Sequence, residues 1–315
     1  MKNVAFIDYN MCERGTTIAT YDYALHNEKI LGNKSFIFYD INSKSKKEKV
    51  INKFKKQFCD VIGFSNFSEV DNYISQNKIT HLYNLIGGRY EPALSKYAKN
   101  CIHYIFDYRD YGDMNVALSP VIRNFKKGLD TLPHMVDLPV FTNDLRSKLG
   151  IPETATVFGG YGGKGMFNIK EAQTAVYEVA SKNKNIYFLF ANFHKFCDTL
   201  PNVIHLPCIV DIKEKVEFIN SCDAMMWARK QGEVMSMAMG EFATKNKPII
   251  ATKKGLFRGH SHLLGDKAFW YSTKKSLINI LENFDKNIES KKDWNAYREY
   301  TPEKVMEIFD KVFLK

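Results

Sequence analysis

The sequence predicts an α/β protein made of two successive units, each a parallel β-sheet covered by helices on both faces. Strand-like apolar runs alternate with helix-like stretches along the whole chain. The alternation restarts after residue 140, close to Pro139, and 315 residues suffice for two medium domains. We therefore expect one domain over residues 1–140, a second over 141–298, and a helix over 299–315 that packs back on the first domain.

In the first unit, each expected strand is a short apolar run bounded by turn residues. These strands fall, in order, at residues 4–9, 35–39, near 61, 82–86 and 102–106. Helices are expected over 18–30 and in the lysine-rich stretch that follows the second strand. A third helix is expected to begin at Ser119–Pro120, because serine favours the N-cap and proline the first turn.

In the second unit, the same alternation predicts strands at residues 156–158, 185–190, 203–206, 223–227 and 248–251. Helices are expected over 142–149, after the glycine-rich turn through 180, over 211–220 and over 234–244. Asp211 with Glu214 resembles a capping box, and Thr301–Pro302 opens the last helix. In open α/β sheets, ligands bind beyond the carboxyl ends of the strands, so we expect the site in a cleft between the two units.

Composition favours anionic partners. The net charge is +10 and the isoelectric point is about 9.1. Seven lysines between 44 and 56 are opposed within that run only by Glu48. This run is either a solvated helix face or a patch that contacts an anionic membrane surface. No nucleic-acid recognition motif is present, so nucleic acid is not an expected partner.

The sequence also predicts a cytoplasmic protein, with peripheral membrane contact as the alternative. The start of the chain lacks the apolar run of a signal peptide, and no stretch has the roughly 18 apolar residues of a membrane span. None of the six cysteines forms a CxxC pair, which indicates reduced thiols. No metal site is expected, because only His260 and His262 are close and no third ligand is identifiable.

The segment from Phe158 to Gly165, FGGYGGKG, joins a predicted strand to a predicted helix. Its glycines permit close backbone approach to a ligand, and Lys164 adds positive charge, so we expect an anionic ligand. A phosphate-loop NTPase is excluded, because Phe158 and Gly165 stand where a glycine and a Ser/Thr are required. A dinucleotide fingerprint is present at Gly160, Gly162 and Gly165, but the next strand does not end in an acidic residue. A tight turn without a ligand is the third interpretation.

Glu233 and Glu241 lie eight positions apart in GEVMSMAMGE, after a predicted strand and on a predicted helix. On a helix, eight residues give about 80° of net rotation and about 12 Å of rise. This spacing suits the two ends of an extended ligand and not a pair that shares one proton. The alternative is a buried amphipathic helix with Glu241 on its surface.

The stretch from CDAMMWAR through these two glutamates to NKPIIAT resembles the retaining, nucleotide-sugar-dependent glycosyltransferases of family 4, which have the GT-B fold. The resemblance covers nearly the whole chain and is strongest over residues 81–275. It implies two facing Rossmann-like domains with a cleft between them, a nucleotide-sugar donor, a glycan or lipid-linked acceptor, and no metal or other cofactor.

The resemblance also implies roles for individual residues. Glu233 would hold hydroxyls of the donor sugar, Glu241 would hold the ribose, and Lys164 would bind the diphosphate. His103 matches a histidine that faces the reacting sugar, although its place in an apolar strand equally fits a histidine packed in the core. The loop containing Arg14, Gly15 and Thr16 would lie near the phosphate and the acceptor.

The chain departs from the family pattern where Gly160 replaces an arginine, which weakens the diphosphate clamp. Arg229 and the amides of Gly232 to Val234 would then help Lys164 to stabilise the leaving diphosphate. The alternatives are an NAD(P)-dependent oxidoreductase or epimerase that uses the fingerprint at 160–165, and a sugar-nucleotide-binding relative without turnover.

Overall fold

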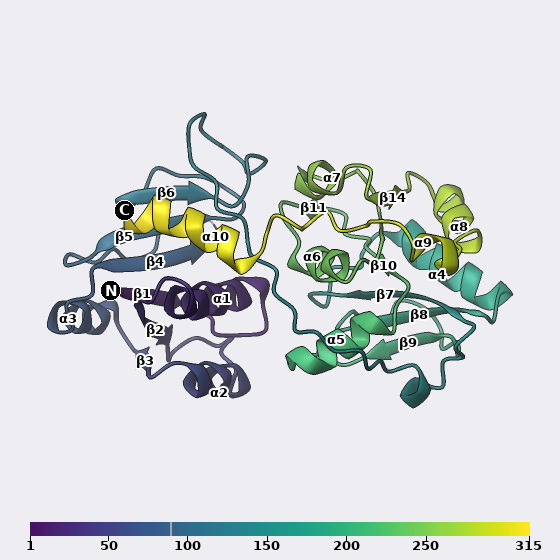
Figure 1. Cartoon of the computed structure of the whole chain (residues 1–315), viewed down its shortest axis with the longest axis horizontal. Helices are drawn as coiled ribbons and strands as arrows, with labels where there is room; N and C mark the ends of the chain where they lie inside the picture. The colour runs from purple at the N-terminus through teal and green to yellow at the C-terminus, as the bar shows by residue number, and fades with distance from the viewer. Residues whose placement is uncertain (89) are drawn as a thin grey trace. The chain divides into compact units, whose positions relative to one another are not determined.

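The computed structural model describes residues 1–88 and 90–315, and the chain divides into two compact units (Figure 1). Unit 1 comprises Met1–Met135 together with Tyr300–Lys315, and unit 2 comprises Val136–Glu299. The first boundary lies five residues before the expected position at 140 (140 minus 135), and the second lies at 299, next to the expected 298.

Unit 1 is a six-stranded parallel sheet in the order β3-β2-β1-β4-β5-β6. Its strands are β1 Asn3–Asp8, β2 Lys34–Asp40, β3 Asp60–Phe64, β4 His81–Ile86, β5 Lys99–Tyr104 and β6 Met114–Ala117. Its helices are α1 Gly15–Lys29, α2 Glu48–Gln57, α3 Phe67–Gln76 and α10 Pro302–Phe309. All six residues of β4 are buried, as expected for a central parallel strand that helices cover on both faces.

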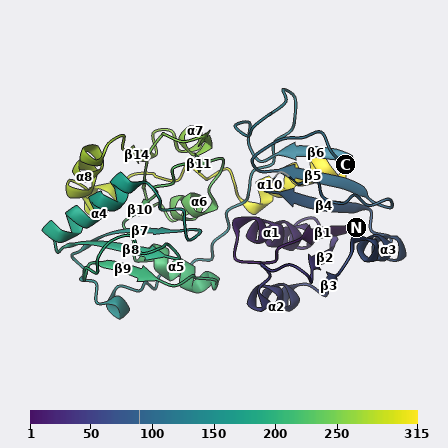
Figure 2. The same cartoon turned by 180° about the vertical axis from the view of Figure 1, so that it is seen from behind.

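The two faces of this sheet are covered by different helices. On one face, Phe6 of β1 and Tyr83 of β4 pack against Tyr23 of α1 and Phe309 of α10. On the other face, alternate residues of β1 and β2 pack against Val70 and Ile74 of α3. The last helix therefore belongs to the core of unit 1, and α10 lies beside α1 in both views (Figures 1 and 2).

Unit 2 is also a six-stranded parallel sheet, in the order β14-β12-β10-β7-β8-β9. Its strands are β7 Thr156–Tyr161, β8 Ile186–Ala191, β9 Val203–Leu206, β10 Ala224–Met226, β12 Ile249–Ala251 and β14 Ala268–Trp270. A separate two-stranded ladder joins β11 Gly232–Glu233 to β13 Phe257–Arg258. Its helices are α4 Lys170–Lys182, α5 Ile212–Asn220, α6 Met237–Thr244, α7 Gly259–Leu264, α8 Lys274–Glu282 and α9 Lys286–Glu289.

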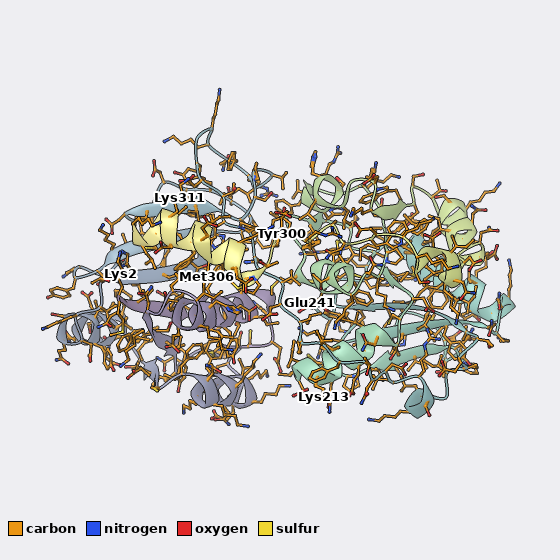
Figure 3. The ribbon with its side chains drawn as sticks, in the orientation of Figure 1. Lys2, Lys213, Glu241, Tyr300, Met306 and Lys311 are labelled. Atoms are coloured by element: carbon orange, nitrogen blue, oxygen red, sulfur yellow. The ribbon has the colours of Figure 1, made fainter. Side chains whose placement is uncertain are left out.

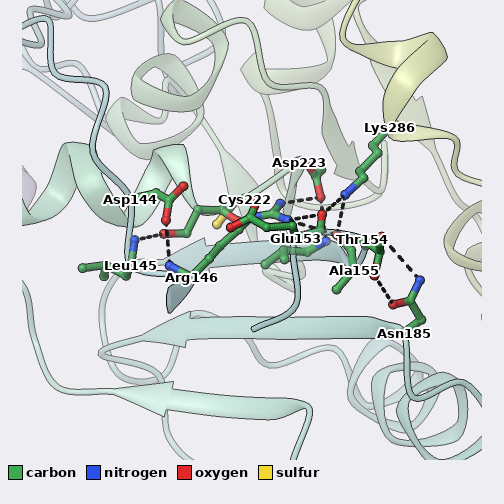
Figure 4. Close-up of polar contacts among 12 residues, drawn as sticks. Asp144, Leu145, Arg146, Glu153, Thr154, Ala155, Asn185, Cys222, Asp223 and Lys286 are labelled. Carbon is green, nitrogen blue, oxygen red and sulfur yellow. Dashed lines mark hydrogen bonds and ion pairs between the residues drawn. The ribbon is translucent and has the colours of Figure 1, made fainter. Parts of the chain in front are cut away.

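A buried ion pair attaches the start of unit 2 to its sheet. The Arg146 guanidinium lies 2.9 Å from Asp223 Oδ2 and also donates to the backbone carbonyls of Ser221 and Ala155. Figure 4 draws this ion pair between Arg146 and Asp223. Asp223 Oδ2 accepts a further hydrogen bond from the amide of Val157 in β7. The Nε, Nη1 and Nη2 atoms of Arg146 all donate hydrogen bonds, so its buried charge is compensated inside the unit.

Some expected elements are confirmed and others are wrong. Asp211 caps α5 by accepting from the amides of Lys213 and Glu214, and Thr301 caps α10. The helix expected at Ser119–Pro120 is absent, because the amide of Arg123 donates to Phe106 of a neighbouring segment and Gly128 adopts φ +90°. The helix expected over 142–149 is only a 3₁₀ turn, Ser147–Leu149. Strands β6, β11, β13 and β14 and helix α3 were not expected.

Candidate functional site

The glycine-rich segment lies at the carboxyl end of β7, where the chain turns toward α4. Lys164 is exposed in that turn and makes no ion pair within the part of the chain that the structure describes. Gly160 lies inside β7 and is buried, and a Cβ atom there would lie 2.7 Å from the carbonyl oxygen of Met226. The absence of an arginine at position 160 therefore follows from close packing of β7 on β10.

The same geometry excludes a dinucleotide fingerprint. In that motif the first glycine follows the strand and the last opens the helix. Here Gly160 is a strand residue, and α4 begins at Lys170, five residues after Gly165 (170 minus 165). The match of Gly160, Gly162 and Gly165 to the fingerprint is thus a coincidence of spacing.

Backbone hydrogen bonds tie the Lys164 turn to two neighbouring loops. The Ala228 carbonyl, after β10, accepts from the amides of Asn168 and Ile169 at 2.8 and 3.1 Å. After β8, the Asn192 side chain donates to the carbonyl of Gly162 at 2.7 Å. The loops that follow β7, β8 and β10 therefore meet at the carboxyl edge of the unit 2 sheet, the edge where open α/β sheets bind ligands.

Glu233 lies at this edge and is 7% exposed. The Arg229 guanidinium lies 2.5 Å from its carboxylate, and both side chains are largely buried. Burial raises the pKa of Glu233, and the positive charge and hydrogen bond of Arg229 oppose that rise. In this conformation Arg229 is therefore a partner of Glu233, and its charge is not directed at an external anion.

Glu233 does not lie on a helix, which corrects the spacing argument for the two glutamates. It belongs to β11, and α6 begins only at Met237, after an N-cap at Ser236. The helix starts later than expected because Gly232 and Glu233 pair with β13. Gly232 fits this ladder through its φ of +72° and its close approach to the Phe257 carbonyl. The rotation of 80° and rise of 12 Å therefore do not apply.

Glu241 lies on α6, and both of its carboxylate oxygens are engaged inside the unit. Oε1 lies 2.8 Å from the Lys215 ammonium of α5, and Oε2 accepts from the Tyr161 hydroxyl at the end of β7. The side chains of Lys215 and Glu241 are 10% and 8% exposed. Figure 3 labels Glu241 among the side chains of unit 2. Glu241 therefore joins α5, α6 and β7, and it is not the surface residue of the alternative interpretation.

Two of the three amides expected to face a diphosphate already have partners. The amide of Gly232 donates to the Arg229 carbonyl at 3.0 Å, and the amide of Glu233 donates to His260 Nδ1 at 3.3 Å. Val234 is buried. The first amides of α6, at Met237 and Ala238, lie outside the helical hydrogen-bond ladder and are the donors that this edge offers to an anion.

Both ring nitrogens of His260 are engaged with the backbone. Its Nε2 lies 2.8 Å from the Thr252 carbonyl, and its Nδ1 faces the amide of Glu233. His262 is exposed two residues away. Among the described residues, no group of three or more His, Cys, Asp or Glu side chains is placed to hold a metal ion. No helix of residues 1–88 and 90–315 is long and apolar enough to cross a bilayer.

His103 of β5 is fully buried in unit 1. Its Nδ1 lies 2.7 Å from the Tyr83 hydroxyl, and its ring packs against Tyr23 and His134. Burial, with His134 as the next cause, lowers the pKa of His103 well below its usual value. A role facing the sugar stays a prediction, and the burial of the ring disfavours it.

The loop of Arg14, Gly15 and Thr16 lies at the carboxyl edge of unit 1, between β1 and α1. Arg14 and Gly15 are exposed, and α1 begins at Gly15 without a side-chain cap or an acidic residue in its first turn. Within the described part of the chain, no side chain caps the first amides of α1, and Arg14 precedes them, which suits an anionic or hydroxyl-bearing ligand.

Tyr161 and Lys215 are the site residues that the sequence analysis missed. A local pattern could have indicated that Lys215 is buried. Lys215 lies three and four residues before Phe218 and Ile219, on the buried side of α5. A lysine on an apolar helix face requires a buried anion. The identity of that anion, Glu241, 26 residues away, has no local pattern.

The sequence matches no protein-family model and no curated protein. Solved structures resemble the chain over nearly its whole length. Anabaena HepE in complex with UDP-glucose has a TM-score of 0.71 at 12% identity, covering 99% of both chains. A glycosyltransferase from Rickettsia africae has a TM-score of 0.70 at 12% identity, covering 99% of this chain and 98% of the other.

A putative UDP-N-acetylglucosamine 2-epimerase from Listeria monocytogenes has a TM-score of 0.59 at 9% identity, covering 99% of this chain and 96% of the other. At such identities the likeness shows the fold alone. The chain thus has the architecture of the GT-B glycosyltransferases, two Rossmann-like domains with parallel six-stranded sheets, as the sequence predicted.

Proposed function

We propose that the chain is a glycosyltransferase that moves a sugar from a nucleotide-diphosphate donor to a glycan or lipid-linked acceptor. The observation that carries the proposal is the meeting of three loops at the carboxyl edge of unit 2, with exposed Lys164, the open end of α6 and the buried acid Glu233. This edge offers cationic and amide donors for a diphosphate and a carboxylate for sugar hydroxyls. The structure of Anabaena HepE with UDP-glucose, which resembles this chain, supports the choice of donor class.

In the proposed reaction, the bond between the anomeric carbon and the diphosphate oxygen breaks, and its electron pair stays on the diphosphate. The acceptor hydroxyl oxygen forms the new bond on the same face of the sugar, and its proton goes to the diphosphate oxygen, so the configuration is retained. Lys164 and the amides of Met237 and Ala238 stabilise the charge that develops on the leaving group, without a metal ion. The acceptor binds near Arg14, Gly15 and Thr16 in unit 1.

Glu233 orients the donor in this scheme and does not attack it. Arg229 keeps the buried carboxylate available as an anion, which accepts hydrogen bonds from donor hydroxyls. The resemblance implied that Glu241 binds the ribose. In this scheme it has a different role, because Lys215 and Tyr161 already bind its two carboxylate oxygens. We propose that it fixes the end of β7, from which the Lys164 turn starts.

The decisive experiment incubates the protein with a panel of UDP- and GDP-sugars, with and without EDTA, and follows the products by NMR. Release of the nucleoside diphosphate with transfer or slow hydrolysis, insensitive to EDTA, supports the proposal. The anomeric coupling constant of the product tests retention. Loss of activity in EDTA would refute metal independence alone.

Two other functions lead to different outcomes in the same experiment. The fold shared with a putative 2-epimerase makes epimerisation the second candidate, and it would invert a sugar carbon without sugar transfer to an acceptor. A non-catalytic relative would bind a nucleotide sugar and leave it unchanged. An NAD(P)-dependent oxidoreductase is no longer favoured, because the residues at 160–165 lack the fingerprint geometry.

We also propose that unit 1 contacts an anionic membrane surface through α2 and the segment before it. Lys49 pairs with Glu13, and Lys53 lies over the Tyr21 ring. Five further lysines here are exposed: Lys44, Lys46, Lys47, Lys55 and Lys56. Sedimentation with phosphatidylserine vesicles should show binding that weakens as salt rises. Binding that is absent, or insensitive to salt, would leave α2 as a solvated helix face.

A further inference from the structure

A groove of 620 Å³ opens at the amino edge of the unit 1 sheet, where β4 and β5 begin. Ligands of parallel sheets bind at the other edge, so this groove is separate from the acceptor loop proposed above. Its lining includes three lysines, one tyrosine, one asparagine and one aspartate: Lys78, Lys96, Lys99, Tyr97, Asn100 and Asp113.

The groove carries an excess of positive charge. Lys78, Lys96 and Lys99 are exposed, and none of them forms an ion pair within residues 1–88 and 90–315. The one lining carboxylate, Asp113, accepts two hydrogen bonds from the main chain and side chain of Asn100, at 2.7 and 2.9 Å. Lys99 also affects the neighbouring residue His81. Burial is the main cause that lowers the pKa of His81 to about 4, and the positive charges of Lys2 and Lys99 lower it further.

The wall that carries Lys96 and Tyr97 is fixed by a buried hydrogen-bond network. Asn100, 4% exposed, accepts from the amide of Ser95 at 2.7 Å and donates to its carbonyl at 3.0 Å. Asp71 accepts from the Ser95 hydroxyl and from the amide of Lys96. The loop therefore presents an ammonium group and an exposed aromatic ring, 59% accessible, on a preformed support.

Lys78 occupies a backbone position that favours glycine. It follows α3 with φ +51°, and the amide of Ile79 closes the helix end on the Ile74 carbonyl at 3.1 Å. Glycine is the usual residue there, because a side chain in this conformation is strained. Lys78 thus places an ammonium group on the rim of the groove at some cost in backbone strain.

We propose that this groove binds a phosphomonoester carried on a group the size of a sugar. Lysine ammonium groups form charge-assisted hydrogen bonds with a dianionic phosphate, and Tyr97 offers an apolar ring face to the attached group. The volume lies within the range of small-molecule sites, about 300–1,000 Å³. This site does not depend on the glycosyltransferase proposal, because none of its residues lies at the carboxyl edges.

Isothermal titration calorimetry at constant ionic strength tests the proposal with glucose 6-phosphate, inorganic phosphate and soluble dihexanoyl phosphatidic acid as probes. We expect saturable binding of glucose 6-phosphate, tighter than that of inorganic phosphate or of the lipid. Tighter binding of the lipid would overturn the choice of a sugar-sized ligand. Equal binding of inorganic phosphate, or no saturable binding of glucose 6-phosphate, would overturn the proposal.

Lys78→Gly separates binding from folding. Because glycine relieves the positive φ, this variant should keep or raise the melting temperature while glucose 6-phosphate affinity falls about tenfold. Lys96→Ala should show the same loss. The control Lys275→Ala/Lys291→Ala, which removes two exposed charges from unit 2, should bind as the wild type does. An equal loss in the control would mean general charge attraction and would contradict a site.

Discussion

The Lys215 ammonium lies 2.8 Å from the Glu241 carboxylate, and both side chains are buried in unit 2. Removal of one partner leaves an uncompensated charge in a medium of low polarity. We predict that Glu241→Gln lowers the free energy of unfolding by about 3 kcal/mol in urea titrations. The double variant Glu241→Gln/Lys215→Met should lose less than the single one, because no buried charge remains.

The matched control for this prediction is Glu178→Gln, which breaks exposed ion pairs on α4 and should change stability little. If Glu241→Gln is as stable as the wild type and only weakens nucleotide binding, Glu241 is a ribose ligand and the structural role assigned here is wrong.

Gly232 supports the strand that places Glu233. A Cβ atom at this position would lie 2.0 Å from the Phe257 carbonyl oxygen, and φ is +72°. Gly232→Ala should therefore lower the free energy of unfolding by about 2 kcal/mol or more. Gly165→Ala is the control, because no atom lies within 4 Å of its Cβ position, and its stability should be unchanged or higher. Similar stabilities for the two variants would contradict the β11–β13 geometry.

Buried His134 predicts acid sensitivity of unit 1. Burial lowers its pKa from 6.5 to about 4, so the folded state binds fewer protons than the unfolded state between these values. Stability should fall as the pH drops from 6.5 toward 4, and His134 should account for about 2 kcal/mol of the loss between pH 7 and 5.

Urea titrations of the wild type and of His134→Phe at pH 7 and pH 5 measure this contribution. Phenylalanine keeps a ring of similar size and removes the titrating group, and His134 Nδ1 has no hydrogen-bond partner among the described residues. The variant should show the smaller pH dependence. An equal pH dependence in both proteins would exclude His134 as the source.

How far the sequence predicts this molecule depends on the range of the interactions. The strands were predictable because a buried parallel strand is a continuous apolar run, as β4 and β8 are. The start of α6 was not, because Gly232 and Glu233 pair with residues 25 positions further along (257 minus 232). Such pairing competes with helix formation and has no local pattern.

In the candidate site, too, local features were predictable from the sequence and long-range contacts were not. Lys164 could be placed from its glycine-rich context, since a turn after a strand is a local feature. The partners of the two glutamates could not, because Tyr161 and Lys215 reach Glu241 across 80 and 26 residues. The apolar strand around His103 left a core role and a functional role open, and the structure places its ring in an aromatic cluster with Tyr23 and His134.

Glu233→Gln tests the role of the buried acid in turnover. Glutamine keeps the size of the side chain and removes its charge, so donor orientation should suffer and kcat/KM should fall about 100-fold. Steady-state release of the nucleoside diphosphate measures the change, with Glu171→Gln on the exposed side of α4 as the control. A folded Glu233→Gln protein with wild-type kcat/KM would remove Glu233 from the site.

The most direct test of the central claim is the affinity of a nucleotide sugar for the wild type and for Lys164→Ala, measured by calorimetry across the donor panel. If the carboxyl edge of unit 2 holds the diphosphate, at least one donor binds, and its dissociation constant rises about tenfold in Lys164→Ala. The control Lys170→Ala, an exposed lysine at the start of α4, should leave it unchanged. Equal affinities of the wild type and Lys164→Ala would contradict the account.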